Sequence, residues 1–325
     1  MPISTVLLYN PNAGRRGYPT GGAFPGLPAL ALGKKTDLNG DPVWLEAALS
    51  HLRVRLGHSV ETFACTSFEE ARHTAAAAAA EKIDVVIAAG GDGTLRAAAE
   101  GLAGSNTALG ILPRGTVNVL ARELFLPLDR IGPALDICLY GVTRRIDLGR
   151  IGERYFLLMC SAGFDARAVH SVRQDVKEVV GAPAYALSAM AALSTFIPPT
   201  MNLVLDGRAW SPGSAFMVVV ANSPSYAGEF RIAPDAEMDD GLLDVILFTA
   251  PPGPLPAQRA AFIRQAGAVT LGFAGSDPDV HLLRARQIEI VAEPATPTQI
   301  DGDSLGETPV LVNVAPKALA IRVPS

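Results

Sequence analysis

One stretch decides how the first half of this chain folds: Ile83-Asp84-Val85-Val86-Ile87-Ala88-Ala89-Gly90-Gly91-Asp92-Gly93-Thr94. Its first six residues, apolar except for Asp84, predict a buried strand, and residues 95–102 predict a helix directly after the glycines. Glycines let a backbone approach a polyphosphate closely, and the amides at the start of a helix attract anions. This order therefore indicates a phosphate-binding turn, although glycine and aspartate also favour ordinary tight turns.

Predicted strands and helices alternate on both sides of this stretch. Strands are predicted at residues 6–9, 59–63 and 108–112, and helices at residues 42–56, 68–82 and from Val117 to Glu123. Gly57 is expected to cap the first helix at its C-terminal end. The alternation predicts an α/β domain with a mostly parallel sheet and helices on both faces.

The second half has a different pattern, in which most of the predicted elements are strands. They lie at residues 155–160, 201–205, 215–221, 242–248, 287–292, 310–314 and 318–323, and only residues 169–194 and 256–268 look helical. We therefore expect a β-rich sandwich of antiparallel sheets. The first predicted domain is residues 1–142, with a flexible insertion at 18–41. The second is residues 143–325, and its last residues are a candidate for a segment that packs on the first domain.

Composition excludes several classes of protein. A net charge of -5 without a basic stripe argues against a nucleic-acid partner. Three scattered cysteines fit a reducing compartment, and no signal peptide is recognisable in residues 1–9. The longest uncharged stretch is residues 179–205. Glycines and prolines interrupt it, so no unbroken part of it reaches the length of a transmembrane helix. That stretch is either part of an apolar ligand pocket or an ordinary buried helix.

Two further loops follow predicted strands of the first domain. Residues 10–16 are turn-rich and basic, and Pro113-Arg114-Gly115-Thr116-Val117-Asn118 offers a glycine, a hydroxyl and an amide. Each segment alone could be an ordinary turn. Because open α/β sheets bind ligands at the carboxyl ends of their strands, we expect these loops and the glycine loop to form one crevice.

These segments resemble the diacylglycerol kinase catalytic-domain family, which also contains sphingosine kinases, ceramide kinases and many bacterial lipid kinases. The resemblance covers nearly the whole chain. It rests on Asn10-Pro11 with Gly14, on residues 90–94, on residues 113–118 with Ala121-Arg122, on Gly163-Phe164-Asp165, on Ala233-Pro234 with residues 239–244, and on Ile300-Asp301-Gly302-Asp303.

The resemblance implies an ATP-dependent lipid kinase with ATP and Mg2+ as its cofactors. It also implies a nucleotide-binding lobe, a β-sandwich lobe that holds the lipid, and ATP at the cleft between them. Thr66 and Thr116 resemble the family's threonines near the nucleotide. With the three loops, the expected ATP-binding set is Asn10, Pro11, Asn12, Ala13, Gly14, Arg15, Arg16, Thr66, Gly90, Gly91, Asp92, Gly93, Thr94, Leu95, Arg96, Thr116 and Asn118.

Two magnesium positions are implied by the same resemblance. Asp92 and Asp147 are similar to an acidic network that orders the catalytic Mg2+ through water. A structural Mg2+ is implied at the 239–241 turn, held by the Asp240 carboxylate and by the carbonyls of Glu237 and Leu242. Without the resemblance, this turn would be interpreted as a hairpin with acidic surface residues.

Asp301-Gly302-Asp303 resembles the family's catalytic signature, in which an acidic residue takes the proton of the lipid hydroxyl. Asp301 is the first choice for this base. Asp303 is the second, because relatives most often carry a longer glutamate at its position. Two aspartates in a turn between strands are also expected on structural grounds alone.

Two departures from the family pattern affect the expected site. Residues 18–41 form a longer link than usual, and Val119 stands where many relatives have an aspartate. The implied partners are a lipid substrate and a transient peripheral contact with a membrane, and a homodimer is one option. The expected location is the cytoplasm, at the inner face of the membrane. The competing hypotheses are an NAD kinase-like small-molecule kinase and a non-catalytic lipid-binding protein that keeps the fold.

Overall fold

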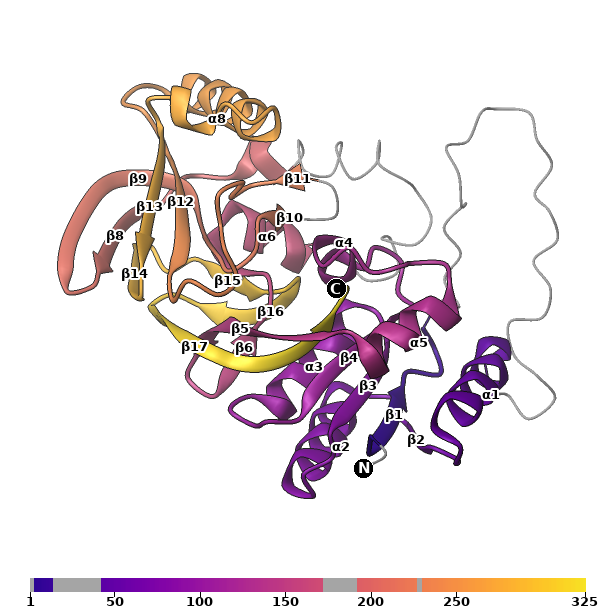
Figure 1. Ribbon diagram of the computed structural model, residues 1–325. Helices are drawn as coiled ribbons and strands as arrows, with labels where there is room; N and C mark the ends of the chain where they lie inside the picture. The colour runs from indigo at the N-terminus through magenta and orange to yellow at the C-terminus, as the bar shows by residue number, and fades with distance from the viewer. Residues whose placement is uncertain (1–2, 14–41, 172–191, 227–229) are drawn as a thin grey trace, which may run out of the picture. The chain divides into compact units, whose positions relative to one another are not determined.

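The computed structural model describes residues 3–13, 42–171, 192–226 and 230–325 of the chain (Figure 1). These residues divide into two compact units. Unit 1 contains Met1–Arg145 together with Leu319–Ser325, and unit 2 contains Ile146–Ala318. Each unit is described by itself below.

Unit 1 is built on a parallel sheet with the strand order β2 (Glu61–Ala64), β1 (Thr5–Tyr9), β3 (Val85–Gly90), β4 (Ala108–Pro113). The last part of β17 (Val310–Val323) completes it, because Ala320 and Ile321 pair in parallel with Ala108 and Leu109 of β4. The three inner strands, β1, β3 and β4, are buried along their whole length. Their near-continuous apolar sequence is typical of strands covered on both faces.

The order of these strands creates a switch point. The chain leaves β1 for β2 on one side of the sheet, and then crosses back to β3 on the other side of β1. The loops that follow β1 and β3 therefore diverge at the carboxyl edge of the sheet. Open α/β sheets bind ligands at such a point.

Helices cover both faces of this sheet. The face formed by Leu7, Ile87 and Leu112 packs against α1 (Val43–Leu56) and α5 (Ile131–Tyr140) in one apolar cluster. The helices α2 (Phe68–Ala80) and α3 (Asp92–Leu102) pack on each other and on β1, β3 and β4. A short α4 (Val119–Glu123) follows β4. Two layers of helices around a parallel sheet confirm the predicted class of the first domain.

Local sequence explains how α2 starts and how it meets α3. Ser67 accepts the amide of Glu70 while the Glu70 carboxylate accepts the amide of Ser67, which is a capping box. The small side chains of α2 allow α3 to approach closely. A β-carbon added to Gly101 would lie 2.3 Å from the carbonyl oxygen of Arg72, so this position of the interface accepts only glycine.

Unit 2 is an antiparallel β-sandwich in which the long strand β9 (Arg208–Ala221) takes part in two sheets. Its first half pairs with β8 (Thr200–Leu205), which continues through β14 (Gln287–Glu293) to the first part of β17. Its second half pairs with β7 (Met159–Gly163) and β12 (Leu243–Thr249). That second sheet is extended by β13 (Val280–Ala285), β15 (Pro297–Ile300) and β16 (Asp303–Glu307).

The core of unit 2 lies between these sheets. Alternate residues of β14 are buried, namely Ile288, Ile290 and Ala292, and they join one cluster with Val218 and Leu247. This alternation is the sequence signature of a strand with one covered face. The sandwich predicted for the second domain is confirmed.

The remaining elements of unit 2 lie around the sandwich. They are the hairpin β5 (Val142–Ile151) and β6 (Arg154–Phe156), the helices α6 (Phe164–Ser171) and α8 (Leu255–Thr270), a short 3-10 helix (Ala274–Ser276), and the two-stranded ladder β10 (Ser225–Tyr226) and β11 (Phe230–Arg231). None of the helices in the described ranges is long and apolar enough to cross a lipid bilayer.

Several predicted boundaries differ from the structure. The single strand predicted at 155–160 is two strands, β6 and β7, because the backbone turns at Leu157 and Leu158. The strands predicted at 310–314 and 318–323 are one strand, β17. The strands β5, β13, β15 and β16 were not predicted, because their sequences mix polar and apolar residues without a clear alternation. Most of the predicted 169–194 helix and part of the uncharged stretch 179–205 lie outside the described residues.

The contact between α2 and α3 gives a stability test. Gly101→Ala should lower the free energy of unfolding of unit 1 by about 1–3 kcal/mol, because the new methyl overpacks a backbone contact. Gly93→Ala is the matched control in the same helix, since a β-carbon there has no atom within 4 Å. The control should be neutral or stabilising by up to about 1 kcal/mol, through helix propensity. Equal urea midpoints for the two variants would contradict the close packing described here.

Candidate active site

The ends of β3 and β4 are tied together by their backbones. The carbonyl of Gly90 accepts hydrogen bonds from the amides of Arg114 at 2.9 Å and Gly115 at 3.1 Å. The loop after β3 and the loop after β4 therefore form one rigid unit at the carboxyl edge of the sheet. The sequence predicted that these loops meet, and the structure brings them together.

This tie requires glycine. A β-carbon on Gly115 would lie 2.4 Å from the α-carbon of Gly91, and one on Gly90 would lie 2.4 Å from the Thr94 hydroxyl oxygen. Both distances are far below any normal contact of a β-carbon. Gly115 is thus needed for the close approach of the two loop backbones, and Gly90 leaves room for the Thr94 side chain.

The N-terminus of α3 has the features of an anion site. Gly91 is its N-cap residue and provides no side chain to accept the first amides of the helix. Gly93 is exposed and a β-carbon there would meet no atom within 4 Å. Unsatisfied amides and the positive end of the helix dipole favour a phosphate group at such a terminus.

The Asp92 carboxylate accepts hydrogen bonds from backbone amides of the protein. Its two carboxylate oxygens accept the amides of Val119 at 3.2 Å and Leu120 at 3.3 Å, so it caps the start of α4. Burial raises the pKa of Asp92, and these amide hydrogen bonds oppose the shift. The predicted water-mediated contact of Asp92 with magnesium would have to compete with this capping role.

Asn118 holds the loop after β4 in its shape. Its side-chain oxygen accepts the amide of Gly115 at 2.9 Å, and its amide nitrogen donates to the carbonyl of Gly115 at 2.8 Å. The residue is buried and has a positive φ of 53°. Asn118 therefore acts on the loop, whereas the neighbouring Thr116 is exposed and open to a ligand.

The loops after β1 and β2 reach the same edge of the sheet. The amide of Asn10 donates to the carbonyl of Ala89 at 3.1 Å, and its side-chain oxygen accepts the amide of Asn12 at 2.8 Å. Pro11 and Ala13 complete this turn. The Thr66 hydroxyl donates to Glu70 at 2.9 Å, beside the start of α2. Gly14, Arg15 and Arg16 lie outside the described residues.

Two residues of the expected ATP set are buried in unit 1. Leu95 is fully buried, and Arg96 is 1% exposed. The Arg96 guanidinium lies 4.5 Å from the centre of the Phe68 ring and 3.7 Å from the Glu100 carboxylate. Their side chains stabilise the packing of α2 and α3, so only their backbones remain near the glycine loop.

Arg114 is a candidate that the expected set omits. It follows β4 directly, is half-buried, and lies with its guanidinium 5.4 Å from the centre of the Trp44 ring. Burial lowers the pKa of Arg114, and its Nε atom has no hydrogen-bond partner in the described parts of the chain. The sequence signal that could have identified Arg114 is its position, as a basic residue between the end of β4 and Gly115.

In unit 2, Asp301 and Gly302 form the two-residue loop of the hairpin that joins β15 and β16. Both have positive φ, 45° and 88°, as a type I′ turn requires. The Asp301 carboxylate accepts the amides of Leu157, Leu158 and Met159 at 2.8 to 3.0 Å. Both oxygens of Asp301 are therefore engaged by backbone amides.

Asp303 has a different environment. It is the first residue of β16 and is exposed. A base must approach the proton that it removes, and a carboxylate that already binds three amides is less suited to this task. The geometry reverses the order expected from the sequence, with Asp303 now ahead of Asp301 as the candidate base.

Asp147 is buried with no exposed surface. Its carboxylate accepts the amide of Gly241 at 2.6 Å and the amide of Lys317 at 2.6 Å. Asp147 thereby joins β5, the 239–241 turn and β17 within unit 2. This geometry favours a structural role over the predicted contact with magnesium-bound water.

The Asp240 carboxylate, expected to hold a structural magnesium, has protein partners on both of its oxygens. One oxygen of Asp240 accepts the amide of Leu242 at 2.9 Å, and the other is paired with Arg284. Glu237 is exposed, and Lys317 donates to the carbonyl of Asp239. The turn is already neutralised by an arginine and a lysine, and the described residues contain no cluster of three acidic, histidine or cysteine residues suited to a metal.

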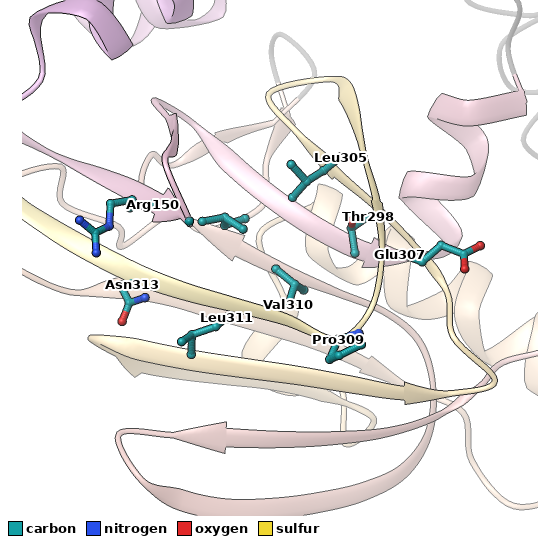
Figure 2. A pocket seen from close by; sticks show the side chains of 10 residues that line it. Arg150, Thr298, Leu305, Glu307, Pro309, Val310, Leu311 and Asn313 are labelled. Atoms are coloured by element: carbon teal, nitrogen blue, oxygen red, sulfur yellow. The ribbon is translucent and has the colours of Figure 1, made fainter.

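A surface hollow of about 460 Å3 lies in unit 2, among β5, β15, β16 and β17 (Figure 2). None of the expected site residues lines it. Its walls are formed by Arg150, Ile151, Gly152, Thr298, Leu305, Glu307, Pro309, Val310, Leu311 and Asn313. Neither its charge nor its shape indicates a ligand class.

Comparison with known proteins identifies the class to which these units belong. Residues 40–151 match the family model described as diacylglycerol kinase catalytic domain. Residues 159–323 match the model described as YegS C-terminal NAD kinase beta sandwich-like domain. The two matches together cover most of the chain and define a kinase with an α/β catalytic domain and a sandwich domain.

Full-length relatives identify the family. A diacylglycerol kinase of Bacillus subtilis (strain 168) is 30% identical over 255 residues, which are 78% of this chain and 82% of that protein. A diacylglycerol kinase of Mycobacterium tuberculosis is 32% identical over 260 residues, with the same shares covered. The chain belongs to the diacylglycerol kinase catalytic-domain family.

A solved structure supports the fold. The crystal structure of a diacylglycerol kinase from Bacillus anthracis str. Sterne is similar, with a TM-score of 0.66 and 19% identity, over 99% of this chain and 97% of that one. At this identity the likeness concerns the fold alone.

The raised pKa of Asp92 predicts how stability depends on pH. A carboxyl group whose folded-state pKa lies above its unfolded value adds stability below the unfolded pKa, and this contribution is lost as the pH rises through the folded pKa. Wild-type protein should therefore gain stability relative to Asp92→Asn as the pH falls from neutral into that range. Thermal unfolding of both proteins in matched buffers measures this difference. Parallel curves for the two proteins would show that Asp92 does not titrate as the structure implies.

Proposed function

We propose that this protein is an ATP-dependent lipid kinase, which transfers the γ-phosphate of ATP to a hydroxyl of a diacylglycerol-like or sphingoid-like lipid. The observation that carries the proposal is the backbone tie of Gly90 to Arg114 and Gly115, beside the uncapped start of α3. It lies next to the switch point of the sheet, where nucleotides bind in open α/β folds. Family membership supports the same activity.

In unit 1, we assign the phosphates of ATP to the α3 amides and to the loops after β1 and β4. Phosphoryl transfer demands positioning and charge neutralisation from the protein, with little covalent chemistry. The half-buried Arg114 offers a cation at this edge, and the exposed Thr116 offers a hydroxyl. Arg15 and Arg16 remain proposals from the sequence.

In unit 2, we assign the proton transfer to Asp303. The lipid hydroxyl gives its proton to the carboxylate while its oxygen forms a bond to the γ-phosphorus. The bond from that phosphorus to the bridging oxygen breaks, and ADP leaves. Asp301 holds the turn that carries Asp303, through its hydrogen bonds to the amides of residues 157–159.

Magnesium enters this proposal with the nucleotide, as the Mg2+–ATP complex. When bound, the ion neutralises phosphate charge during the transfer. The Asp240 turn, already paired with Arg284, is not given a metal.

Partners and location follow from the proposed substrate. A lipid acceptor implies transient contact with a membrane surface, from the cytoplasmic side. A homodimer is an option on which the proposal does not depend. The net charge of -5 supports the absence of a nucleic-acid partner.

The direct test incubates purified protein with Mg2+, labelled ATP and a panel of acceptors. Diacylglycerol, monoacylglycerol and a sphingoid base in mixed micelles represent the lipid kinase, and NAD represents the alternative small-molecule kinase. A labelled lipid supports the proposal, and labelled NADP would replace it. Tight lipid binding without any labelled product would favour the non-catalytic alternative.

The two aspartates of the turn should behave differently. Asp303→Asn should lower kcat by about 100-fold to 10,000-fold, the range typical of a lost general base, with the KM for ATP unchanged. Asp301→Asn should mainly lower the unfolding temperature, because the amides of residues 157–159 lose a charged acceptor. Steady-state kinetics and thermal unfolding of both variants separate the two roles. A wild-type kcat in Asp303→Asn would contradict this assignment and would favour Asp301 as the general base.

The glycine tie should be needed for nucleotide binding. Gly115→Ala should weaken ATP binding by about tenfold or more, because the two loops must separate to admit the methyl group. Gly267→Ala, in α8 of unit 2, is the control for a changed glycine, because a β-carbon there has open space and the backbone is helical. Isothermal titration with a non-hydrolysable ATP analogue measures both. An unchanged affinity in Gly115→Ala would remove this loop from the ATP site.

A further inference from the structure

Behind the turn at residues 301–303 lies a group of polar side chains that has no part in the activity described so far. Ser161 belongs to β7, Asp165 to α6, Tyr226 to β10 and Gln299 to β15. Ser161, Asp165 and Gln299 are 1%, 5% and 0% exposed. Polar groups at this depth are costly unless each is hydrogen-bonded.

Gln299 connects this group to the turn. Its amide nitrogen donates to the Ser161 hydroxyl oxygen at 2.9 Å and to the Asp165 carboxylate at 3.0 Å. Its side-chain oxygen accepts the amide of Gly302 at 2.8 Å. The orientation of the Gln299 amide is determined by these partners, because the reversed orientation would place NH2 against the amide of Gly302.

Asp165 holds Gln299 in this orientation. Its carboxylate also accepts the hydroxyls of Ser161, at 2.5 Å, and of Tyr226. All three of these partners donate, so the carboxylate serves only as an acceptor. A buried and fully satisfied network of this kind allows one arrangement of its members.

The turn is therefore held from two directions. The Asp301 carboxylate binds the amides of residues 157–159, and the Gln299 side chain binds the amide of Gly302. These contacts fix the backbone directly before Asp303, the next residue. An error of about 1 Å in the position of a reacting group can cost about 100-fold in rate.

We propose that Gln299, oriented by Asp165 and Ser161, is a positioning residue for Asp303. It touches neither substrate nor reacting atoms, and it acts by fixing the turn that presents the base. This inference rests on the proposed kinase function, and it adds a set of residues on which the rate of transfer depends.

The test compares two buried glutamines of unit 2. Gln299→Met removes both the donors and the acceptor at similar volume. Gln265→Met is the matched control, since Gln265 is also 0% exposed and donates to one backbone carbonyl, that of Thr249, at 2.7 Å. Ser161→Ala is a milder variant, which removes one member of the network and leaves Gln299 in place.

We expect Gln299→Met to lower kcat by about 10-fold to 100-fold with the KM for ATP within about twofold of wild type. Ser161→Ala should give a smaller loss of kcat, of the same kind. Gln265→Met should lower the unfolding temperature and leave kcat unchanged. If Gln265→Met lowers kcat as much as Gln299→Met does, the effect is general destabilisation and the inference is overturned.

A double-mutant cycle supplies the decisive readout. If Gln299 acts through Asp303, adding Gln299→Met to Asp303→Asn should change kcat by less than about twofold, because the positioned base is already absent. Multiplicative losses would overturn the positioning role. Different results would contradict the proposed function itself. These are a wild-type protein that phosphorylates no lipid, or a wild-type kcat in both Asp303→Asn and Asp301→Asn.

Discussion

The carbonyl of Gly90 is the point on which unit 1 depends. It accepts two backbone amides from the loop after β4, and Gly115 of that loop lies so close to the Gly91 backbone that a β-carbon would not fit. Asp92, two residues further on, caps α4, and Asn118 closes the loop after β4 on itself. The result is a set of loops whose shape is fixed before any ligand arrives. Such preorganisation places amides at the site of the phosphates without a cost in ordering at the moment of binding.

A second theme is the use of aspartates as acceptors for the backbone. Asp92, Asp147 and Asp301 each accept at least two amides, and each was assigned a chemical role by its motif. A carboxylate is a strong acceptor for amides at turns and helix starts, so the same residue type serves architecture and chemistry. The motif identifies where an aspartate stands, and only its partners show which task it performs.

The sequence predicted much of the fold because the signals were local. The capping box at Ser67 and Glu70, the left-handed Gly57 after α1 and the apolar run of β3 each act within a few residues. The features that it missed depend on distant partners. The amides that engage Asp301 are more than 140 residues away in sequence, and the Gln299 network joins four separate elements. The ion pair of Arg284 with Asp240 was likewise hidden, because β13 was not recognised as a strand.

The path of β17 has a consequence for how the chain acquires its structure. Its first part belongs to the sandwich, and its last part supplies the fifth strand of the parallel sheet that begins with β1. The edge of β4 therefore stays unpaired on the ribosome until unit 2 has been synthesised. An unpaired edge of a parallel sheet invites association with other chains. The sheet of unit 1 is thus completed only after unit 2 has been made. During the whole synthesis of unit 2, the free edge of β4 can pair with other chains.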